Sequence, residues 1–139
     1  MTLLGKFHPL LVHFPIALVL AAAASEFVVI ATPRQAWRTV AVANLRAGAA
    51  MAIVTAITGW LFALSPLVDA SPSLEWHRWV GMAGAAGAIG AALLSWRVQA
   101  PARRSAFVYR LTLFVTALLV AITGHLGGTL VWGARFFQR

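Results

Sequence analysis

The chain has 139 residues, of which 61% are hydrophobic and only 10% are charged, and its mean hydropathy is +0.85. These values exclude a water-soluble enzyme or binding module of this size and favour a lipid bilayer as the environment. The net charge of +8 does not indicate nucleic-acid binding, because Lys and Arg lie in connections and at helix ends, where membrane topology accounts for them.

Four apolar stretches, at residues 9–31, 40–64, 77–98 and 107–131, each reach the length of about 20 residues that a crossing helix needs. Each stretch is continuously apolar, without the alternation of a β-barrel strand, which favours helices. The sequence therefore predicts an all-α integral membrane bundle of four transmembrane helices. Residues 1–139 form a single domain in this interpretation, with helices at approximately 9–31, 40–64, 72–98 and 105–131.

The first predicted helix has an alternative interpretation as a signal peptide, because small residues up to Ser25 follow an apolar run. Against this, the apolar run continues to Ala31, and His13 and Pro15 would lie inside the signal core. We therefore expect a retained first helix.

Proline marks the ends of three predicted helices, because it lacks an amide donor and disfavours helix in the residue before it. Pro33, Pro66 and Pro101 follow the first, second and third helices. The pair Ser71-Pro72 is typical of a helix start, with a hydroxyl cap and proline in the first turn. The third helix is thus expected to begin near Pro72.

A short repeat suggests a duplicated helical hairpin. Residues 56–61 read AITGWL and residues 121–126 read AITGHL, while FH at 7–8 resembles WH at 76–77. Two hairpins with the same orientation are related by a pseudo-twofold axis along the membrane normal. This arrangement predicts that His8 lies at the depth of His77, and Trp60 at the depth of His125.

The distribution of basic residues predicts the orientation. Seven flank the first and third connections and four lie at the other side: Arg34, Arg38, Arg46, Arg97, Arg103, Arg104 and Arg110 against Lys6, Arg78, Arg135 and Arg139. This excess favours a cytoplasmic location for the first and third connections. Both termini are then expected to face outward, into the periplasm, from a bacterial inner membrane.

All four histidines, His8, His13, His77 and His125, are predicted to lie toward this outward side. Ionisable residues within membrane spans are rare and by default functional, although hydrogen bonding to backbone carbonyls is the structural alternative. Neutral imidazole binds haem iron and also zinc or copper. Because the chain has no cysteine, covalent c-type haem is excluded. The histidines therefore predict non-covalent haem b, with imidazoles as axial iron ligands.

The pairing of the ligands stays open at this point. His8 and His13 are separated by about 140° around a helix, so they do not readily serve one iron. The repeat favours His8 opposite His77, whereas depth favours His13 opposite His125.

Two further residues are candidates for the cofactor site. Arg78 is expected at the interface, where a basic group meets haem propionates. Gly84 belongs to a glycine-rich face of the third helix, which either leaves space for a flat porphyrin or packs closely against another helix.

Three motifs carry a family resemblance: HPLLVHFPIAL at residues 8–18, WHRWVG at 76–81 and GHLGGTLV at 124–131. Over essentially the whole chain they resemble a family of bacterial four-helix membrane domains of unknown function. Its members occur alone or joined to c-type cytochrome or Rieske-type modules, which implies a place in electron transfer. His8, His13 and His77 match the usual histidine positions of the family, whereas some members carry an aromatic residue where His125 stands. Family members also often have an acid after the glycine that corresponds to Gly59, where this chain has Trp60.

The leading prediction is a small membrane b-type cytochrome that exchanges electrons with a periplasmic c-type cytochrome, a Rieske-type protein or a quinone. A stand-alone enzyme is not indicated, because no Ser–His–Asp arrangement, phosphate loop or paired acids stand out. Two alternatives remain: a zinc- or copper-binding or translocating protein that uses the same histidines, and a non-catalytic membrane anchor or assembly subunit. Homo-oligomerisation stays open.

Overall fold

The computed structural model describes residues 3–66, 68–97 and 103–133, and every regular element in these ranges is a helix. A 3-10 helix, η1 (Leu3–Phe7), leads into α1 (His8–Leu11) and α2 (His13–Ala31). The remaining helices are α3 (Trp37–Ala63), α4 (Pro72–Ser95) and α5 (Arg103–Trp132). The predicted all-α four-helix bundle is confirmed, with α1 and α2 together forming the first long helix.

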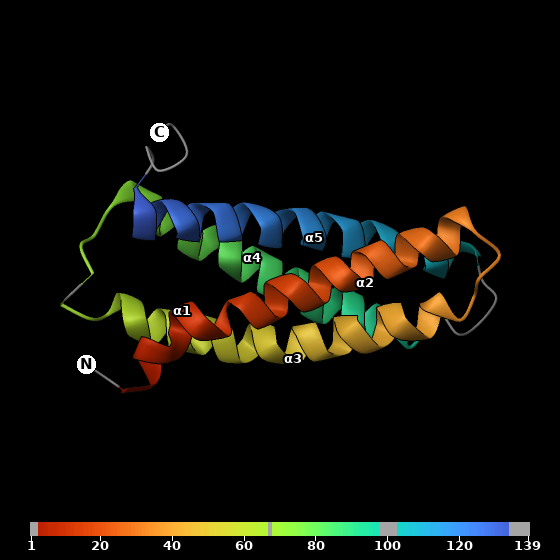
Figure 1. Ribbon diagram of the computed structural model, residues 1–139, viewed down its shortest axis with the longest axis horizontal. Helices are drawn as coiled ribbons and strands as arrows, with labels where there is room; N and C mark the ends of the chain where they lie inside the picture. Colours follow the sequence, from red (N-terminus) through yellow and green to blue (C-terminus); the bar gives the residue numbers. More distant parts are fainter. Residues whose placement is uncertain (1–2, 67, 98–102, 134–139) are drawn as a thin grey trace.

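The four long helices lie side by side and alternate in direction, so α1 and the last turns of α5 share one end of the bundle (Figure 1). The most extensive packing is between α2 and α3 and between α4 and α5. Packing of α3 on α4 and of α2 on α5 completes the bundle. The chain is therefore built as two helical hairpins placed against each other, as the repeat indicates.

Among the residues that the structure describes, three helical segments are long and apolar enough to cross a membrane, namely Leu3–Ala31, Trp37–Ala63 and Ser105–Trp132. The helix α4 does not reach the same hydropathy, because its first turns carry Glu75, His77 and Arg78 and it is rich in glycine. Its 24 residues nevertheless extend about 36 Å, which is enough to cross the apolar core of a bilayer, about 30 Å thick.

Small side chains form much of the interior, while large apolar side chains cover the outside. Ala22, Ala41, Ala88 and Ala91 are fully buried, whereas residues such as Phe27 are exposed. Small residues let helix backbones approach closely, which drives helix association where the solvent is lipid. This arrangement agrees with a bundle whose outer surface contacts acyl chains.

Glycines mark the closest helix crossings. A Cβ atom on Gly48 would lie 3.1 Å from Cγ2 of Val19, and one on Gly87 would collide with the Thr116 hydroxyl. On Gly84 a Cβ atom would lie 3.3 Å from Cγ1 of Val120. The glycine-rich face of α4 at Gly84 and Gly87 thus packs closely against α5.

Local chemistry explains two helix boundaries. The Ser71 hydroxyl accepts a hydrogen bond from the Leu74 amide at 3.2 Å, so α4 begins at Pro72, as predicted. The break between α1 and α2 follows from Pro15, which cannot donate to the carbonyl of Leu11. The Thr55 hydroxyl of α3 donates to the Met51 carbonyl oxygen at 2.8 Å, and its oxygen lies 3.5 Å from the Leu11 carbonyl oxygen.

Candidate cofactor site

Two of the four histidines meet inside the bundle. His8 opens α1 and His77 lies in the second turn of α4, and their ring centres are 6.4 Å apart. The planes of the two rings are inclined at 78°. Of the two pairings that the sequence leaves open, the structure brings together the one favoured by the repeat.

Each ring is fixed by a backbone carbonyl of the next helix. His8 Nδ1 lies 3.1 Å from the Thr55 carbonyl oxygen, and His77 Nδ1 lies 3.1 Å from the Thr123 carbonyl oxygen. A carbonyl oxygen only accepts, so Nδ1 carries the hydrogen in both rings. The neutral imidazoles therefore keep an unprotonated Nε2, which is the nitrogen available to a metal.

A glycine lies against the edge of each ring. A Cβ atom on Gly59 would lie 2.7 Å from Cε1 of His8, and one on Gly127 would lie 3.1 Å from Cε1 of His77. Each glycine follows the carbonyl-bearing threonine by four residues in the sequence, Thr55 in one case and Thr123 in the other. Each hairpin thus holds its histidine with a threonine and a glycine at the same spacing. This feature was not predicted from the sequence.

The two rings line a cavity of about 960 Å³, close to the upper end of the range of about 300–1,000 Å³ for ligand and cofactor sites. Apolar side chains form much of its wall, among them Val12, Ile16 and Leu130. Polar and charged side chains, among them Asp69, Ser71 and Arg78, line the rest of the wall.

The other predicted site residues take different positions. His13 also lines the cavity, but its side chain is exposed and its Nδ1 lies 3.3 Å from the Leu10 carbonyl oxygen. His125 is exposed on α5 and is not part of the cavity wall, and neither is Gly84. Arg78 does line the cavity. The structure thus gathers His8, His77, Arg78 and His13 at the cavity, and leaves His125 and Gly84 outside it.

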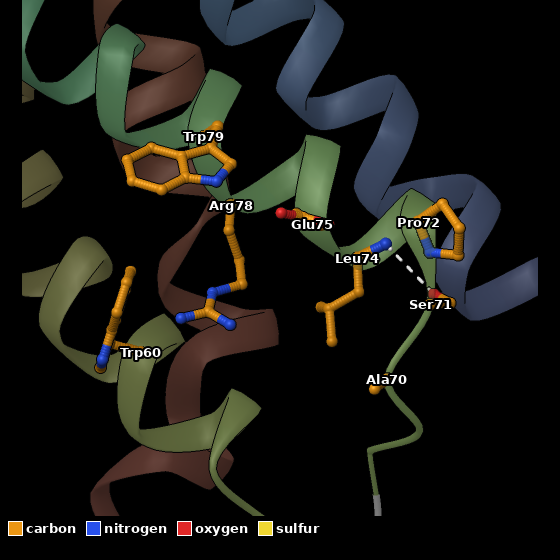
Figure 2. A pocket seen from close by; sticks show the side chains of 8 residues that line it. All are labelled: Trp60, Ala70, Ser71, Pro72, Leu74, Glu75, Arg78 and Trp79. Carbon is orange, nitrogen blue, oxygen red and sulfur yellow. Dashed lines mark hydrogen bonds between the residues drawn. The ribbon is translucent and has the colours of Figure 1, made fainter.

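Arg78 stands where this cavity meets a second one of about 500 Å³, which is lined by Trp60, Ala70, Ser71, Pro72, Leu74, Glu75, Arg78 and Trp79. Figure 2 shows its side chain reaching from α4 toward the Trp60 ring on α3. The guanidinium carbon lies 4.0 Å from the centre of that ring, which is a cation–π contact. Within the described ranges no carboxylate forms an ion pair with Arg78, so its donors remain available to an anionic group at the mouth.

The histidine pair does not extend to a larger ligand set. Within residues 3–66, 68–97 and 103–133, no three His, Cys, Asp or Glu side chains are grouped to hold a metal ion. Protein zinc sites use three or four such ligands. The pair supplies two imidazoles, which is the number of axial ligands in a haem with two histidine ligands.

The fold and composition define a multi-pass membrane protein made of two helical hairpins. Residues 6–137 match the family model described as "Predicted membrane protein (DUF2231)", so the chain belongs to this family. The match covers most of the chain and confirms the resemblance seen in its motifs. No curated protein and no solved structure matches the chain.

Proposed function

We propose that the protein is a small b-type membrane cytochrome in which His8 and His77 are the axial ligands of one non-covalent haem b. The observation that carries this proposal is the meeting of two imidazoles whose Nδ1 atoms both face backbone carbonyls. Carbonyl partners of this kind orient metal-binding histidines and raise their basicity.

The spacing of the rings supports the same ligand set. Two imidazoles that share one metal ion through bonds of about 2.0–2.1 Å have ring centres roughly 5–6.5 Å apart. The observed separation of 6.4 Å falls within that range. Arg78, at the mouth of the cavity, would hold the haem carboxylates.

Bound haem would supply one-electron chemistry, and the chain's own residues set the conditions for it. His8 and His77 fix the iron, and the position near one end of the bundle keeps the site close to an external partner. We propose a periplasmic c-type cytochrome, a Rieske-type protein or a quinone as that partner. The chain acts as an electron carrier in this proposal and not as a stand-alone enzyme.

The proposal is tested by the absorption spectrum of protein purified from cells supplied with haem, with a pyridine haemochrome assay for stoichiometry. A Soret band, sharp reduced α and β bands and one haem per chain are expected. A colourless protein containing stoichiometric zinc or copper would favour the metal-binding alternative. A colourless protein with neither would favour an anchor or assembly subunit, and either outcome would contradict the cytochrome proposal.

We propose the outward orientation of both termini, because arginine is in excess at the first and third connections. The chain has no cysteine, so single-cysteine variants are specific reporters. Lys6→Cys is expected to react with a membrane-impermeant maleimide on intact spheroplasts, and Arg34→Cys only after lysis. The reverse pattern would place the histidine pair near the cytoplasmic face.

Gly59→Ala is expected to lower the haem affinity about tenfold, as loss of an orienting contact to a metal ligand does. The added methyl group would lie 2.7 Å from Cε1 of His8, so the ring must move away from the Thr55 carbonyl. Haem titration of the apoprotein in detergent measures the effect. Gly90→Ala is the matched control, because a Cβ atom there meets nothing within 4 Å. Equal affinities of the two variants would show that Gly59 does not position His8.

A further inference from the structure

The smaller cavity, beside the first turns of α4, contains chemistry that the haem proposal does not use. Its volume of about 500 Å³ lies within the range of about 300–1,000 Å³ for ligand sites. Arg78 is shared with the cavity of His8 and His77, whereas Glu75 and Trp79 line only the smaller cavity. The smaller cavity therefore has residues of its own that are open to a ligand.

Two side chains of opposite charge line this cavity without pairing with each other. Glu75 and Arg78 are the charged residues among its described lining. They are three positions apart on α4, which places their Cβ atoms about 5–6 Å apart. Glu75 is exposed and Arg78 is half-buried. Within residues 3–66, 68–97 and 103–133, the ion pairs are those of Glu26, so no side chain neutralises either group.

The contact of Arg78 with Trp60 accounts for the missing ion pair. Figure 2 shows the guanidinium group reaching toward the Trp60 ring and away from the Glu75 carboxylate. A guanidinium group has several N–H donors, and a contact with an aromatic ring does not use them as hydrogen bonds to oxygen would. Arg78 therefore keeps donors for an anionic group in each of the two cavities that it lines.

Two neighbouring side chains add groups of matching chemistry. The Ser71 hydroxyl oxygen accepts a hydrogen bond from the Leu74 amide at 3.2 Å, which leaves the hydroxyl hydrogen to donate. The exposed Trp79 ring offers an aromatic face, which attracts an ammonium group. The cavity thus combines donors for an anion, from Arg78 and Ser71, with a carboxylate and an indole ring for a cation.

The position of the cavity indicates which molecule carries both charges to it. The cavity lies where α3 has ended at Ala63 and α4 begins at Pro72, at one end of the bundle. Trp76 and Trp79 are exposed in the first turns of α4. Exposed tryptophan near a helix end is typical of the headgroup level of a bilayer. A molecule with a phosphate and an ammonium group at that level is a zwitterionic phospholipid.

We propose that this cavity binds the headgroup of phosphatidylethanolamine, with its phosphate on Arg78 and Ser71 and its ammonium group on Glu75 and Trp79. The primary ammonium group donates N–H hydrogen bonds to a carboxylate, as the choline group of phosphatidylcholine does not. Phosphatidylglycerol lacks the positive charge. The site does not depend on the haem proposal, because Glu75 and Trp79 lie outside the histidine cavity. Soluble phosphoethanolamine offers the same groups, so the experiment must separate the two sources.

Native mass spectrometry of the full-length protein in detergent resolves bound lipids one by one. The protein as purified is titrated with phosphatidylethanolamine, phosphatidylcholine and phosphatidylglycerol of identical acyl chains, and the dissociation constant of the first bound lipid is measured for each. Phosphatidylethanolamine is expected to bind about tenfold more tightly than phosphatidylglycerol, the value of one charge-assisted hydrogen bond.

The two charged residues should have different effects on this preference. Glu75→Gln should bring the two dissociation constants to near equality, because the ammonium group loses its counter-charge. Arg78→Gln should weaken the binding of all three lipids about tenfold and keep the preference, because the phosphate is common to them. Asp69→Asn and Lys6→Gln are the matched controls, since they remove exposed charges at the same end of the bundle that do not line this cavity (Figure 1). Both controls should bind as the wild type does.

Equal dissociation constants for phosphatidylethanolamine and phosphatidylglycerol in the wild type would overturn the proposal without any variant. An equal loss of preference in Glu75→Gln and Asp69→Asn would also overturn it, because it would assign the preference to general surface charge. Displacement of the lipid by millimolar phosphoethanolamine would overturn the lipid assignment, and retention of the lipid supports it. A colourless protein that keeps the preference supports this site and contradicts only the cytochrome proposal.

Discussion

His77→Ala is expected to yield protein with little or no haem, or with a five-coordinate high-spin iron in place of a low-spin one. His77 is the only histidine of α4, and b-type haem has no covalent tether that would retain it after the loss of an axial ligand. His8→Ala should have the same effect, because the two rings are held by equivalent carbonyl contacts. Absorption spectra and the ratio of haem to protein after purification measure the loss.

The matched controls are the other two histidines, His13 and His125. His125→Ala removes an exposed imidazole outside the cavity, and His13→Leu removes an exposed one at its wall. Both variants should keep the wild-type spectrum. If His77→Ala instead retains an unchanged low-spin spectrum and His125→Ala loses it, the ligands are His125 and a histidine of the first helix.

The helices of this protein were predictable because the ends of the apolar runs coincide with residues that start or stop a helix, such as serine followed by proline. Ser71 and Pro72 act within a few residues of each other, so the start of α4 follows from local chemistry alone. The interruption at Val12 was not predicted, although its cause, Pro15, is equally local. The Leu11 carbonyl oxygen, to which Pro15 cannot donate, lies 3.5 Å from the Thr55 hydroxyl of another helix, and no sequence pattern predicts that neighbour.

The histidine pair was only partly predictable. The repeat aligns Gly59 with Gly124, whereas the residue that packs on His77 is Gly127, about one helical turn further along α5. Helix packing sets this register, and a Cβ atom on Gly124 would instead lie 3.2 Å from Cδ1 of Ile16. The usable signal is the spacing of threonine and glycine, which recurs at Thr55 and Thr123 but does not coincide with the stronger six-residue repeat.

The ion pairs of the buried Glu26 with Arg38 and Arg110 show a different limit of sequence interpretation. Arg38, Arg46 and Arg110 served in the sequence only as evidence for orientation, since arginine near a helix end has that general explanation. A single acid inside a span, Glu26, was the available signal, because such residues are paired when they persist in a membrane. Which arginines face it depends on the rotation of each helix about its own axis, and tertiary packing decides that rotation.

Glu26→Gln is expected to lower the free energy of unfolding by about 3 kcal/mol, the cost of breaking a buried ion pair by removing one partner. The amide keeps the size of the side chain but leaves Arg38 and Arg110 without a counter-charge between α2, α3 and α5. The expected cost lies at the low end of the range for broken buried ion pairs, because both arginine side chains are partly exposed. Reversible unfolding in mixed micelles measures the change.

Glu75→Gln is the control, since this acid is exposed in the first turn of α4 and its loss should change stability by less than about 1 kcal/mol. Equal stabilities of the two variants would contradict a stabilising role for the buried ion pairs, and the haem spectrum should be unchanged in both.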